Sequence, residues 1–276
     1  MQRATIGILL LTLATACGLV DERRHGDASP PRPTTAADTH LPFGNPSNAT
    51  ADPANMDNFL MNHGDLTLSY NNSRGALNWI AWRTTVADLG KRRERPLFKP
   101  DMSLPPNFRR IQYYDYAGSG YDRGHMVPAA DRFADERKMA DTFLMTNIVP
   151  QAPDLNQYPW NKLESYIRGT VRRRKDAYVI AGVYGEKGSI RGRITIPTNL
   201  WKVIVLLRPG SNEITAATRV IAVDMPNENG IADIRWQNYI TTVRNIEQRT
   251  GYDLLSDLSK DLQDAIETRT FQTPAY

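Results

Sequence analysis

The sequence predicts an α+β fold for the main part of the chain. Runs of β-branched residues follow one another in its second half, and helical patterns stand apart from them rather than alternating with them. The 276 residues, of which 41% are hydrophobic and 23% charged, suffice for one large domain or two small ones. No internal repeat or second change of composition divides the chain after its N-terminal part. We therefore expect a single domain at residues 56–276.

Residues 1–17 have the pattern of an export signal. Arg3 precedes an apolar run at 6–14 that is short for a transmembrane helix, and small residues follow it up to Cys17. The pattern resembles a bacterial lipoprotein signal, in which this cysteine becomes the lipidated first residue, although Ala14 stands where such signals usually have Leu. Simple secretion and a chance apolar start are the alternatives. We expect a lipoprotein anchored through Cys17 and facing the periplasm or the outside, or otherwise a secreted or periplasmic protein.

Cys17 is the only cysteine of the chain. Once it is lipidated or removed, disulfides and cysteine-ligated zinc are excluded from the folded part. Residues 18–55 are rich in Pro, Thr, Ala, Asp and Asn, a composition that buries too little apolar surface to offset the entropy of ordering. They are predicted to form a flexible tether.

A β-hairpin is predicted at the start of the domain. Residues 66–70 alternate between apolar and polar side chains, 71–75 are typical of a turn, and 76–82 form a second apolar run. The polar, proline-punctuated stretch 91–106 is expected to cross the surface, where functional side chains often lie. We further expect a strand or extended segment at 108–116, a helix at 131–142 and a buried strand at 143–149.

A strong helical pattern begins at Asn156. Pro159 stands in its first turn, and Trp160, Leu163, Ile167 and Val171 recur at helical spacing. The β-branched runs that follow predict an antiparallel sheet and lie at residues 178–183, 193–196, 201–207 and 218–223. Two closing helices are expected at 231–249 and 258–268, with Gly251 as a stop signal between them.

Histidine is scarce, and this limits the possible chemistry. Two of the four histidines lie in the predicted tether, so a multi-histidine zinc site is not expected. His63 is interpreted as structural. His125 follows Arg123 and Gly124 and precedes Pro128, a bend that can present a side chain rather than bury it. With an ordinary pKa near 6.5, its imidazole suits a general base that takes a proton from water.

The helix that begins at Asn156 carries candidate metal-binding groups. Asn156 and Glu164 are two turns apart on one face, and Arg168 follows one turn later. Mg²⁺ prefers oxygen ligands and keeps several waters, so one amide oxygen with a carboxylate in the outer shell can hold it. An ordinary polar helix face is the alternative for this helix taken alone. The nearby histidine motif favours metal-assisted attack on a phosphodiester.

Positive charge gathers at residues 91–95, at 109–110 and at 168–175. The formal charge of +4 and the pI near 9.1 only weakly favour an anionic partner, because many soluble proteins carry as much charge. Each cluster also suits a solvated turn or helix end. The last one follows the Asn/Glu run, which favours contact with phosphate.

Asp122-Arg123-Gly124-His125, the run at 146–151, and Asn156, Trp160, Leu163 and Glu164 together resemble the DNA/RNA non-specific endonuclease family. These ββα-metal nucleases include the Serratia and cyanobacterial sugar-non-specific nucleases and mitochondrial endonuclease G. The resemblance extends from about Asp65 to the C-terminal helix. It implies a central, mainly antiparallel sheet flanked by helices and a nuclease that acts on DNA and RNA.

The resemblance also implies roles for individual residues. His125 is expected to be the general base, Asn156 the direct ligand of a single Mg²⁺ or Mn²⁺, and Glu164 the residue that orders metal-bound water. Arg123 and Arg168 are expected to contact phosphate, and Asn147 to support the catalytic site. The family also has an arginine in the upstream loop, for which both Arg93 and Arg95 are candidates. Asp122 is left with a structural role only.

The implied reaction is a single in-line displacement that leaves 5′-phosphate ends. Low selectivity for sequence and sugar is expected, because phosphate and metal carry the contacts. The alternative from another class is a non-catalytic, surface-tethered nucleic-acid-binding lipoprotein. The presence of His125, Asn156 and Glu164 favours the enzyme.

Overall fold

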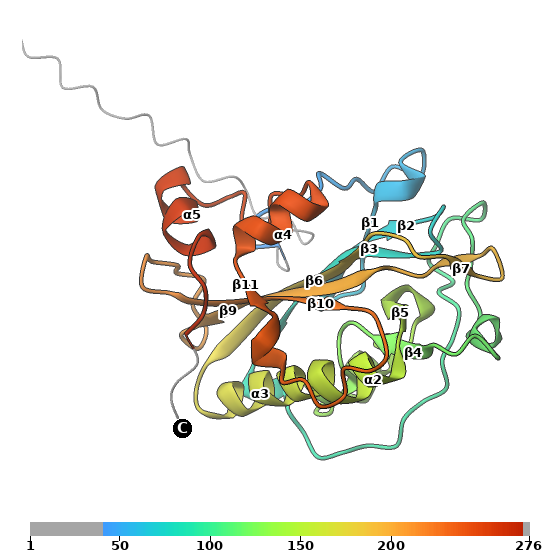
Figure 1. Cartoon of the computed structure of the whole chain (residues 1–276), viewed down its shortest axis with the longest axis horizontal. Helices are drawn as coiled ribbons and strands as arrows, with labels where there is room; N and C mark the ends of the chain where they lie inside the picture. The colour runs from blue at the N-terminus through green and yellow to red at the C-terminus, as the bar shows by residue number, and fades with distance from the viewer. Residues whose placement is uncertain (1–40, 273–276) are drawn as a thin grey trace, which may run out of the picture. The chain divides into compact units, whose positions relative to one another are not determined.

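The structure is a computed structural model and describes residues 41–272. The predicted signal at 1–17, including Cys17, and the tether up to residue 40 lie outside the described residues. A seven-stranded antiparallel sheet runs in the order β1-β2-β3-β6-β9-β10-β11 (Figure 1). Its strands are β1 (Phe59–Asn62), β2 (Leu66–Asn71), β3 (Ala76–Thr84), β6 (Asp176–Tyr184), β9 (Asn199–Leu207), β10 (Arg219–Pro226) and β11 (Ile240–Thr241). Two small ribbons pair β4 (Asp122–His125) with β5 (Ile148–Gln151) and β7 (Ser189–Ile190) with β8 (Ile194–Thr195).

Both faces of the sheet are covered. The α-helices are α1 (Glu136–Asp141), α2 (Pro153–Leu155), α3 (Asn161–Arg172), α4 (Val243–Thr250) and α5 (Lys260–Glu267), and a π-helical turn (Asn156–Trp160) joins α2 to α3. Figure 1 shows α2 and α3 on one face and α4 and α5 on the other. Short 3-10 turns lie at Met56–Asn58, Val86–Asp88, Tyr113–Tyr116, Ala129–Asp131, Met145–Asn147 and Trp236–Tyr239.

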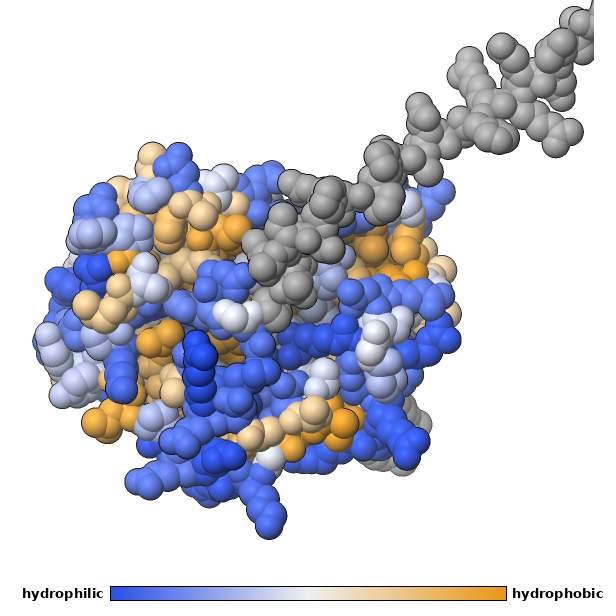
Figure 2. All heavy atoms as spheres, turned by 180° about the vertical axis from the view of Figure 1, so that it is seen from behind, coloured by the Kyte–Doolittle hydropathy of each residue, from blue (hydrophilic) through white to orange (hydrophobic). Residues whose placement is uncertain are grey.

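The central strands are apolar on both sides because each face packs on its own core. Along β6, Val179 and Ala181 belong to the core under α3, while Tyr178 and Ile180 belong to the core under α4 and α5. Along α3, Leu163, Ile167 and Val171 point into the first core, as their spacing predicted. On the face seen in Figure 2, hydrophobic residues reach the surface as several separate patches among hydrophilic ones.

The predicted α+β class, hairpin and antiparallel sheet are confirmed. The hairpin joins β2 and β3 with Asn71 opposite Ala76, and β6, β9 and β10 coincide with three of the later β-branched runs. The predicted strand at 193–196 is only the two-residue β8, paired with β7 outside the main sheet.

The folded part begins earlier than Met56. Leu41, Phe43 and Ala49 are buried in the core under α4 and α5, and Thr50 bridges to Phe59. The prediction of a tether rested on the polar composition of this stretch and did not take account of these three apolar residues. Residues 41–55 therefore belong to the folded domain and not to a tether.

Two helix predictions were too long at their N-terminal ends. The side chain of Asp135 accepts a hydrogen bond from Lys138 N and caps α1, so the helix at 131–142 shrinks to Glu136–Asp141. Thr142 and Phe143 follow it. Thr242 caps α4 in the same way through Asn245 N, so the helix at 231–249 begins only at Val243. Residues 231–242 hold a 3-10 turn and β11 instead.

Three predictions around the functional motif also need correction. Residues 108–116 form no strand but end in a 3-10 turn, in which Asp115 accepts a hydrogen bond from Gln112 N. The strand predicted at 143–149 is a 3-10 turn followed by β5, which includes Pro150 because this two-stranded ribbon tolerates a missing donor. The helix that should start at Asn156 starts one turn earlier, at Pro153. Within residues 41–272 no helix is long and apolar enough to cross a membrane.

Candidate active site

A cavity of about 520 Å³ opens beside β4 and the N-terminal part of α3. Six of the residues singled out from the sequence line it: Arg95, Arg123, His125, Asn156, Glu164 and Arg168. They come from the surface loop before residue 100, from β4 and from the helical segment. The ribbon of β4 and β5 together with this helical segment forms the ββα arrangement that the resemblance implied. Asn147 and Arg93 are not among the lining residues.

His125 ends β4 and pairs with Ile148 of β5. Its ring packs between Phe98 and Phe143, with centroid distances of 5.3 and 4.8 Å. Gly124 is required before it, because a Cβ atom there would lie 2.2 Å from the side chain of Gln151. The motif thus places an aromatic-lined imidazole at the pocket wall.

The surroundings of His125 keep its imidazole neutral. Burial, and after it the positive charge of Arg95, lower the pKa of His125 to about 3, so the imidazole is neutral at neutral pH. Its Nε2 is buried and has no hydrogen-bond partner among the described residues. A neutral imidazole beside a pocket can accept a proton.

Asn147 fixes the backbone that follows His125. Its Oδ1 accepts a hydrogen bond from Val127 N over 2.9 Å, and its Nδ2 donates to the carbonyls of Val127 and Thr142 over 3.0 and 2.8 Å. All hydrogen-bonding capacity of its amide nitrogen is used in the buried turn. The side chain therefore holds the backbone behind the pocket wall.

Asn156 lies in the π-helical turn, where Pro159 supplies no N–H for the regular helical ladder. Its Nδ2 donates to Asp122 Oδ2 over 2.9 Å, and Gln157 Nε2 donates to the same oxygen over 2.9 Å. The structural role expected for Asp122 is therefore to hold the side chains of Asn156 and Gln157. In the described part of the chain no hydrogen bond uses Oδ1 of Asn156, which leaves an amide oxygen suited to a hard cation.

Glu164 faces the pocket from α3 and is held from the core side by a lysine. Lys202 Nζ lies 3.6 Å from Glu164 Oε1, and Arg168 Nη1 lies 3.9 Å from Glu164 Oε2. Burial raises the pKa of Glu164, and the charges of Lys202 and Arg168 oppose this shift. Two basic side chains thus flank this carboxyl group.

Lys202 is completely buried in β9. Its ammonium group lies 4.1 Å from the ring centre of Trp160 and 5.4 Å from that of Trp82. Burial lowers the pKa of Lys202, an effect that Glu164 opposes. Sequence reasoning missed this residue, although a lysine inside the apolar run 200–207 was a visible signal.

The guanidinium of Arg168 is held by hydrogen bonds to two neighbouring side chains. Its Nη1 donates to Asp131 Oδ1 over 3.1 Å, and its Nη2 donates to Ser165 Oγ over 3.2 Å. Asp131 is buried and also accepts from Trp82 Nε1. The guanidinium is therefore oriented before any ligand arrives.

The structure distinguishes the two candidate arginines of the upstream loop. Arg95 lines the pocket, together with Arg92, which sequence reasoning did not single out. Arg93 turns away, because its guanidinium donates to the carbonyls of Phe133 and Ala134 over 2.6 and 3.1 Å. Arg123 lies over the ring of Phe98, 5.2 Å from its centre. Four arginines thus surround the histidine, amide and carboxylate, which favours a phosphate ligand.

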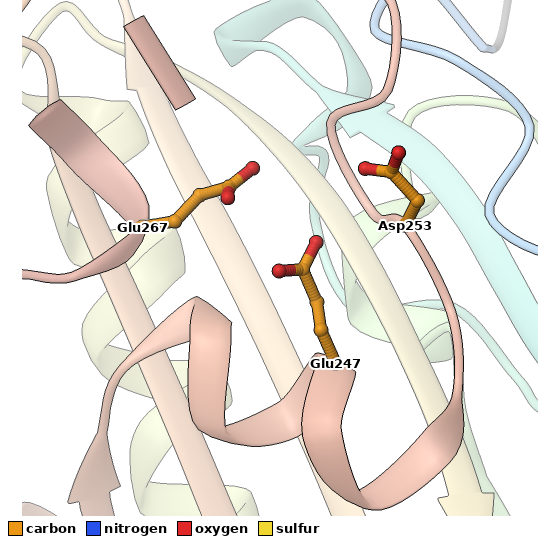
Figure 3. A group of neighbouring side chains, drawn as sticks. All are labelled: Glu247, Asp253 and Glu267. Atoms are coloured by element: carbon orange, nitrogen blue, oxygen red, sulfur yellow. The ribbon is translucent and has the colours of Figure 1, made fainter. Parts of the chain in front are cut away.

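A separate group of acidic residues lies on the opposite face of the sheet. Carboxylate oxygens of Glu247, Asp253 and Glu267 lie within 4.8 Å of one another, and Figure 3 shows the three groups pointing together. Arg244 already neutralises part of this charge, since its guanidinium lies 2.8 Å from Glu267 and 3.5 Å from Glu247. We interpret the group as an ion-pair network that joins α4 to α5.

Comparisons with known proteins relate this chain to nucleases. The sequence model of the DNA/RNA non-specific endonuclease family matches residues 44–261. A nuclease of Nostoc sp. is 44% identical over 234 residues, which cover 83% of this chain and 85% of that protein. Human mitochondrial endonuclease G is 32% identical over 195 residues, which cover 65% of this chain and 63% of that protein.

A solved structure of similar fold is that of EndoG in complex with EndoGI. It superposes with a TM-score of 0.69 at 22% identity and covers 84% of this chain and 96% of that one. At that identity the likeness speaks for the fold, a ββα-metal nuclease with a mainly antiparallel sheet. Together with the family match over most of the domain, it shows that this chain belongs to the DNA/RNA non-specific endonuclease family.

Proposed function

We propose that this chain is a Mg²⁺-dependent endonuclease that hydrolyses phosphodiester bonds of DNA and RNA and leaves 5′-phosphate ends. One observation carries the proposal: His125, Asn156, Glu164 and four arginines from distant parts of the sequence line one pocket. A neutral imidazole, oxygen donors for a cation and guanidinium groups are what hydrolysis of a phosphodiester needs.

The residues present fit a single divalent cation, which membership of a ββα-metal nuclease family implies. Asn156 offers Oδ1 as a direct ligand, and Glu164 offers a carboxylate that orders bound water. When bound, the cation supplies Lewis-acid stabilisation of the phosphate charge and acidifies the water on the leaving-group side. Mg²⁺ suits this all-oxygen donor set, and Mn²⁺ is expected to substitute for it.

The chain's own residues then divide the remaining work. His125 takes the proton of the attacking water. Arg95, Arg123 and Arg168 bind the phosphate oxygens and stabilise the added negative charge. Since these groups address phosphate and not base edges, low selectivity for sequence and for the 2′-hydroxyl is expected.

Digestion of supercoiled plasmid and of a structured RNA, with Mg²⁺ and with excess chelator, tests the activity. Chelator-sensitive loss of both substrates, with 5′-phosphates detected by exonuclease that requires them, is the expected result. His125→Ala is the matched inactive control and should still bind DNA. Bound but intact plasmid with the wild-type protein favours the alternative, a non-catalytic nucleic-acid-binding protein.

We also propose that the protein is exported and anchored through Cys17. The apolar run at 6–14 and the single cysteine that follows it support this proposal. Mass spectrometry of the mature N-terminus tests it. A diacylated or triacylated peptide that begins at Cys17 is expected, and an unmodified protein that lacks Cys17 refutes the anchor.

A further inference from the structure

Beside the pocket, two tyrosines stand out in the 3-10 turn Tyr113–Tyr116. Tyr113 and Tyr114 are 53% and 54% exposed, whereas the next two residues of the turn are buried. Their rings contact each other edge to face, with centroids 5.4 Å apart and an interplanar angle of 73°. Large aromatic surfaces left open to solvent in pairs are typical of binding surfaces.

The turn is rigid, so the rings are presented in a fixed arrangement. Asp115 accepts a hydrogen bond from Gln112 N over 2.8 Å, and Ala117 N donates to Tyr114 O over 3.0 Å. The ring of Tyr116 is buried in a small core together with Ile148, the residue paired with His125. The turn is therefore anchored to the same ribbon that carries the proposed general base.

Three arginines surround this turn. Arg123 Nη1 donates to Tyr113 O over 3.2 Å, and Arg191 Nη2 donates to Ala117 O over 3.0 Å. Arg193 Nε lies 3.6 Å from Asp115 Oδ2. The carbonyl contacts orient Arg123 and Arg191 without neutralising them, so both keep a full positive charge at the edge of the aromatic pair.

Arg123 connects the turn to the pocket. It lines the cavity, precedes His125 by two residues in β4 and touches the turn through the same guanidinium. A nucleic-acid strand that places one phosphate at His125 therefore reaches the two tyrosines next, on the side of the pocket where Arg123 lies. Aromatic faces interleaved with positive charge bind unpaired bases, since stacking accepts every base and arginine follows the backbone.

We propose that Tyr113 and Tyr114, with Arg123 and Arg191, form a stacking platform for unpaired nucleotides next to the scissile phosphate. The inference rests on the proposed function and specifies its substrate: single strands, or a locally opened duplex, contact the protein through bases as well as phosphates. In an intact duplex the base faces are already stacked, so the platform adds little there.

Binding is best measured in the His125→Ala background, with the full chain, by fluorescence anisotropy. The probes are a 12-nucleotide single strand, the duplex of the same sequence, and an abasic strand with the same phosphates. Tyr113→Ala/Tyr114→Ala is expected to raise the Kd for the single strand about tenfold, since the bases lose the two rings on which they stack. The Kd values for the duplex and the abasic strand should stay within about twofold.

Two controls separate stacking from damage to the fold. Tyr113→Phe/Tyr114→Phe keeps the rings and should bind as the parent does. Met102→Ala truncates another exposed apolar side chain, 72% exposed and outside the pocket, and should change no Kd. Equal losses on all three probes, or no loss on any, overturn the platform.

Hydrolysis of bis(p-nitrophenyl) phosphate distinguishes failure of the platform from failure of the proposed function. This substrate is too small to reach from the pocket across the turn. When His125 is intact, the tyrosine double variant should hydrolyse this substrate at the wild-type rate while losing activity on single strands. If the wild type itself hydrolyses neither substrate, the proposed function fails; if it hydrolyses both and the variant loses both alike, only the platform fails.

Discussion

Asn156 donates a hydrogen bond to Asp122, the first residue of β4, over 2.9 Å and across 34 positions of the chain. An amide that donates through its nitrogen presents its carbonyl oxygen on the other side. Asp122 therefore orients the oxygen that we assign to the cation. The strand that carries His125 and the π-helical turn that carries Asn156 are joined by this bond.

Asp122→Ala is expected to weaken metal binding rather than to abolish catalysis. Partners of a metal ligand typically contribute 10- to 100-fold in affinity, so the Mg²⁺ concentration for half-maximal activity should rise about tenfold. Titration of activity with Mg²⁺ measures this. Gln157→Ala removes the other donor to the same carboxylate oxygen and should leave the titration nearly unchanged. Coincident Mg²⁺ curves for Asp122→Ala and the wild type contradict the assignment.

Arg95 and Arg93 provide a matched pair two residues apart. Arg95 lines the pocket, whereas Arg93 donates only to the carbonyls of Phe133 and Ala134. Arg95→Ala should lower kcat/KM about 100-fold, as loss of a group that stabilises developing charge does. Arg93→Ala should lower kcat/KM less than threefold. Similar losses in both variants show that the loop acts through its net charge and not through Arg95.

Part of the site could be predicted from the sequence, and part could not. The helical spacing of Leu163, Ile167 and Val171 predicted the helix of the site from a local pattern, and the resemblance carried by the motif around His125 implied its ββα arrangement. The choice between Arg93 and Arg95 depended on two carbonyls about forty positions away, which no local pattern reveals.

Contacts that are not visible in local sequence patterns explain the other errors of the sequence-based predictions. Lys202 reaches Glu164 only because β9 lies under α3, and residues 41–55 join the domain only because three apolar side chains find a core. Capping by Asp135 and Thr242 shortened two helices whose apolar periodicity alone ran further. Sequence patterns thus singled out residues that line one pocket, and contacts between distant elements determined the residues around them.

Lys202→Met tests whether the buried ammonium group positions Glu164. The side chains have similar length, but removing one partner of a buried ion pair leaves the charge of the other less compensated, so the variant is expected to have a lower Tm and still be folded at the assay temperature. Activity should nevertheless fall at least tenfold, because Glu164 loses the cation 3.6 Å from Oε1. Lys202→Arg should recover part of it. Wild-type activity in Lys202→Met contradicts a role for this contact.

The pKa values of the two histidines of the described region should be shifted in opposite directions. Burial and Arg95 lower the pKa of His125 to about 3, whereas Asp101, 2.8 Å from His63, outweighs burial and raises the pKa of His63. His63 then stabilises the fold below its ordinary pKa, and this stabilisation is lost as the pH rises through the raised value. His125 opposes folding as the pH falls below about 6.5, because only the unfolded chain takes up the proton.

Heteronuclear NMR of the imidazole nitrogens across pH 4–8 measures both pKa values directly. His125 should remain neutral down to pH 5 in the metal-free, substrate-free protein, and His63 should be protonated at pH 6. His125→Ala and His63→Ala assign the two signals. A His125 signal that titrates near 6.5 shows that water reaches the ring and that the pocket does not hold it neutral.

Glu267 makes the contact between α4 and α5 sensitive to pH. Burial, and after it the charge of Glu247, raise the pKa of Glu267 to about 7, although Arg244 opposes the shift. Below its ordinary pKa of 4.5 the group is protonated in both states. Between 4.5 and about 7 the unfolded chain releases the proton and the folded protein keeps it, so stability from this group falls as the pH rises.

Glu267→Gln should therefore raise the free energy of unfolding at pH 8, by on the order of 1 kcal/mol, and change it little at pH 4.5. Urea unfolding at the two pH values measures the difference, with Asp264→Asn, the exposed carboxylate that Arg244 also binds, as the control. A Gln variant that is less stable than the wild type at pH 8 shows that the ion pair with Arg244 outweighs the cost of burying the carboxylate.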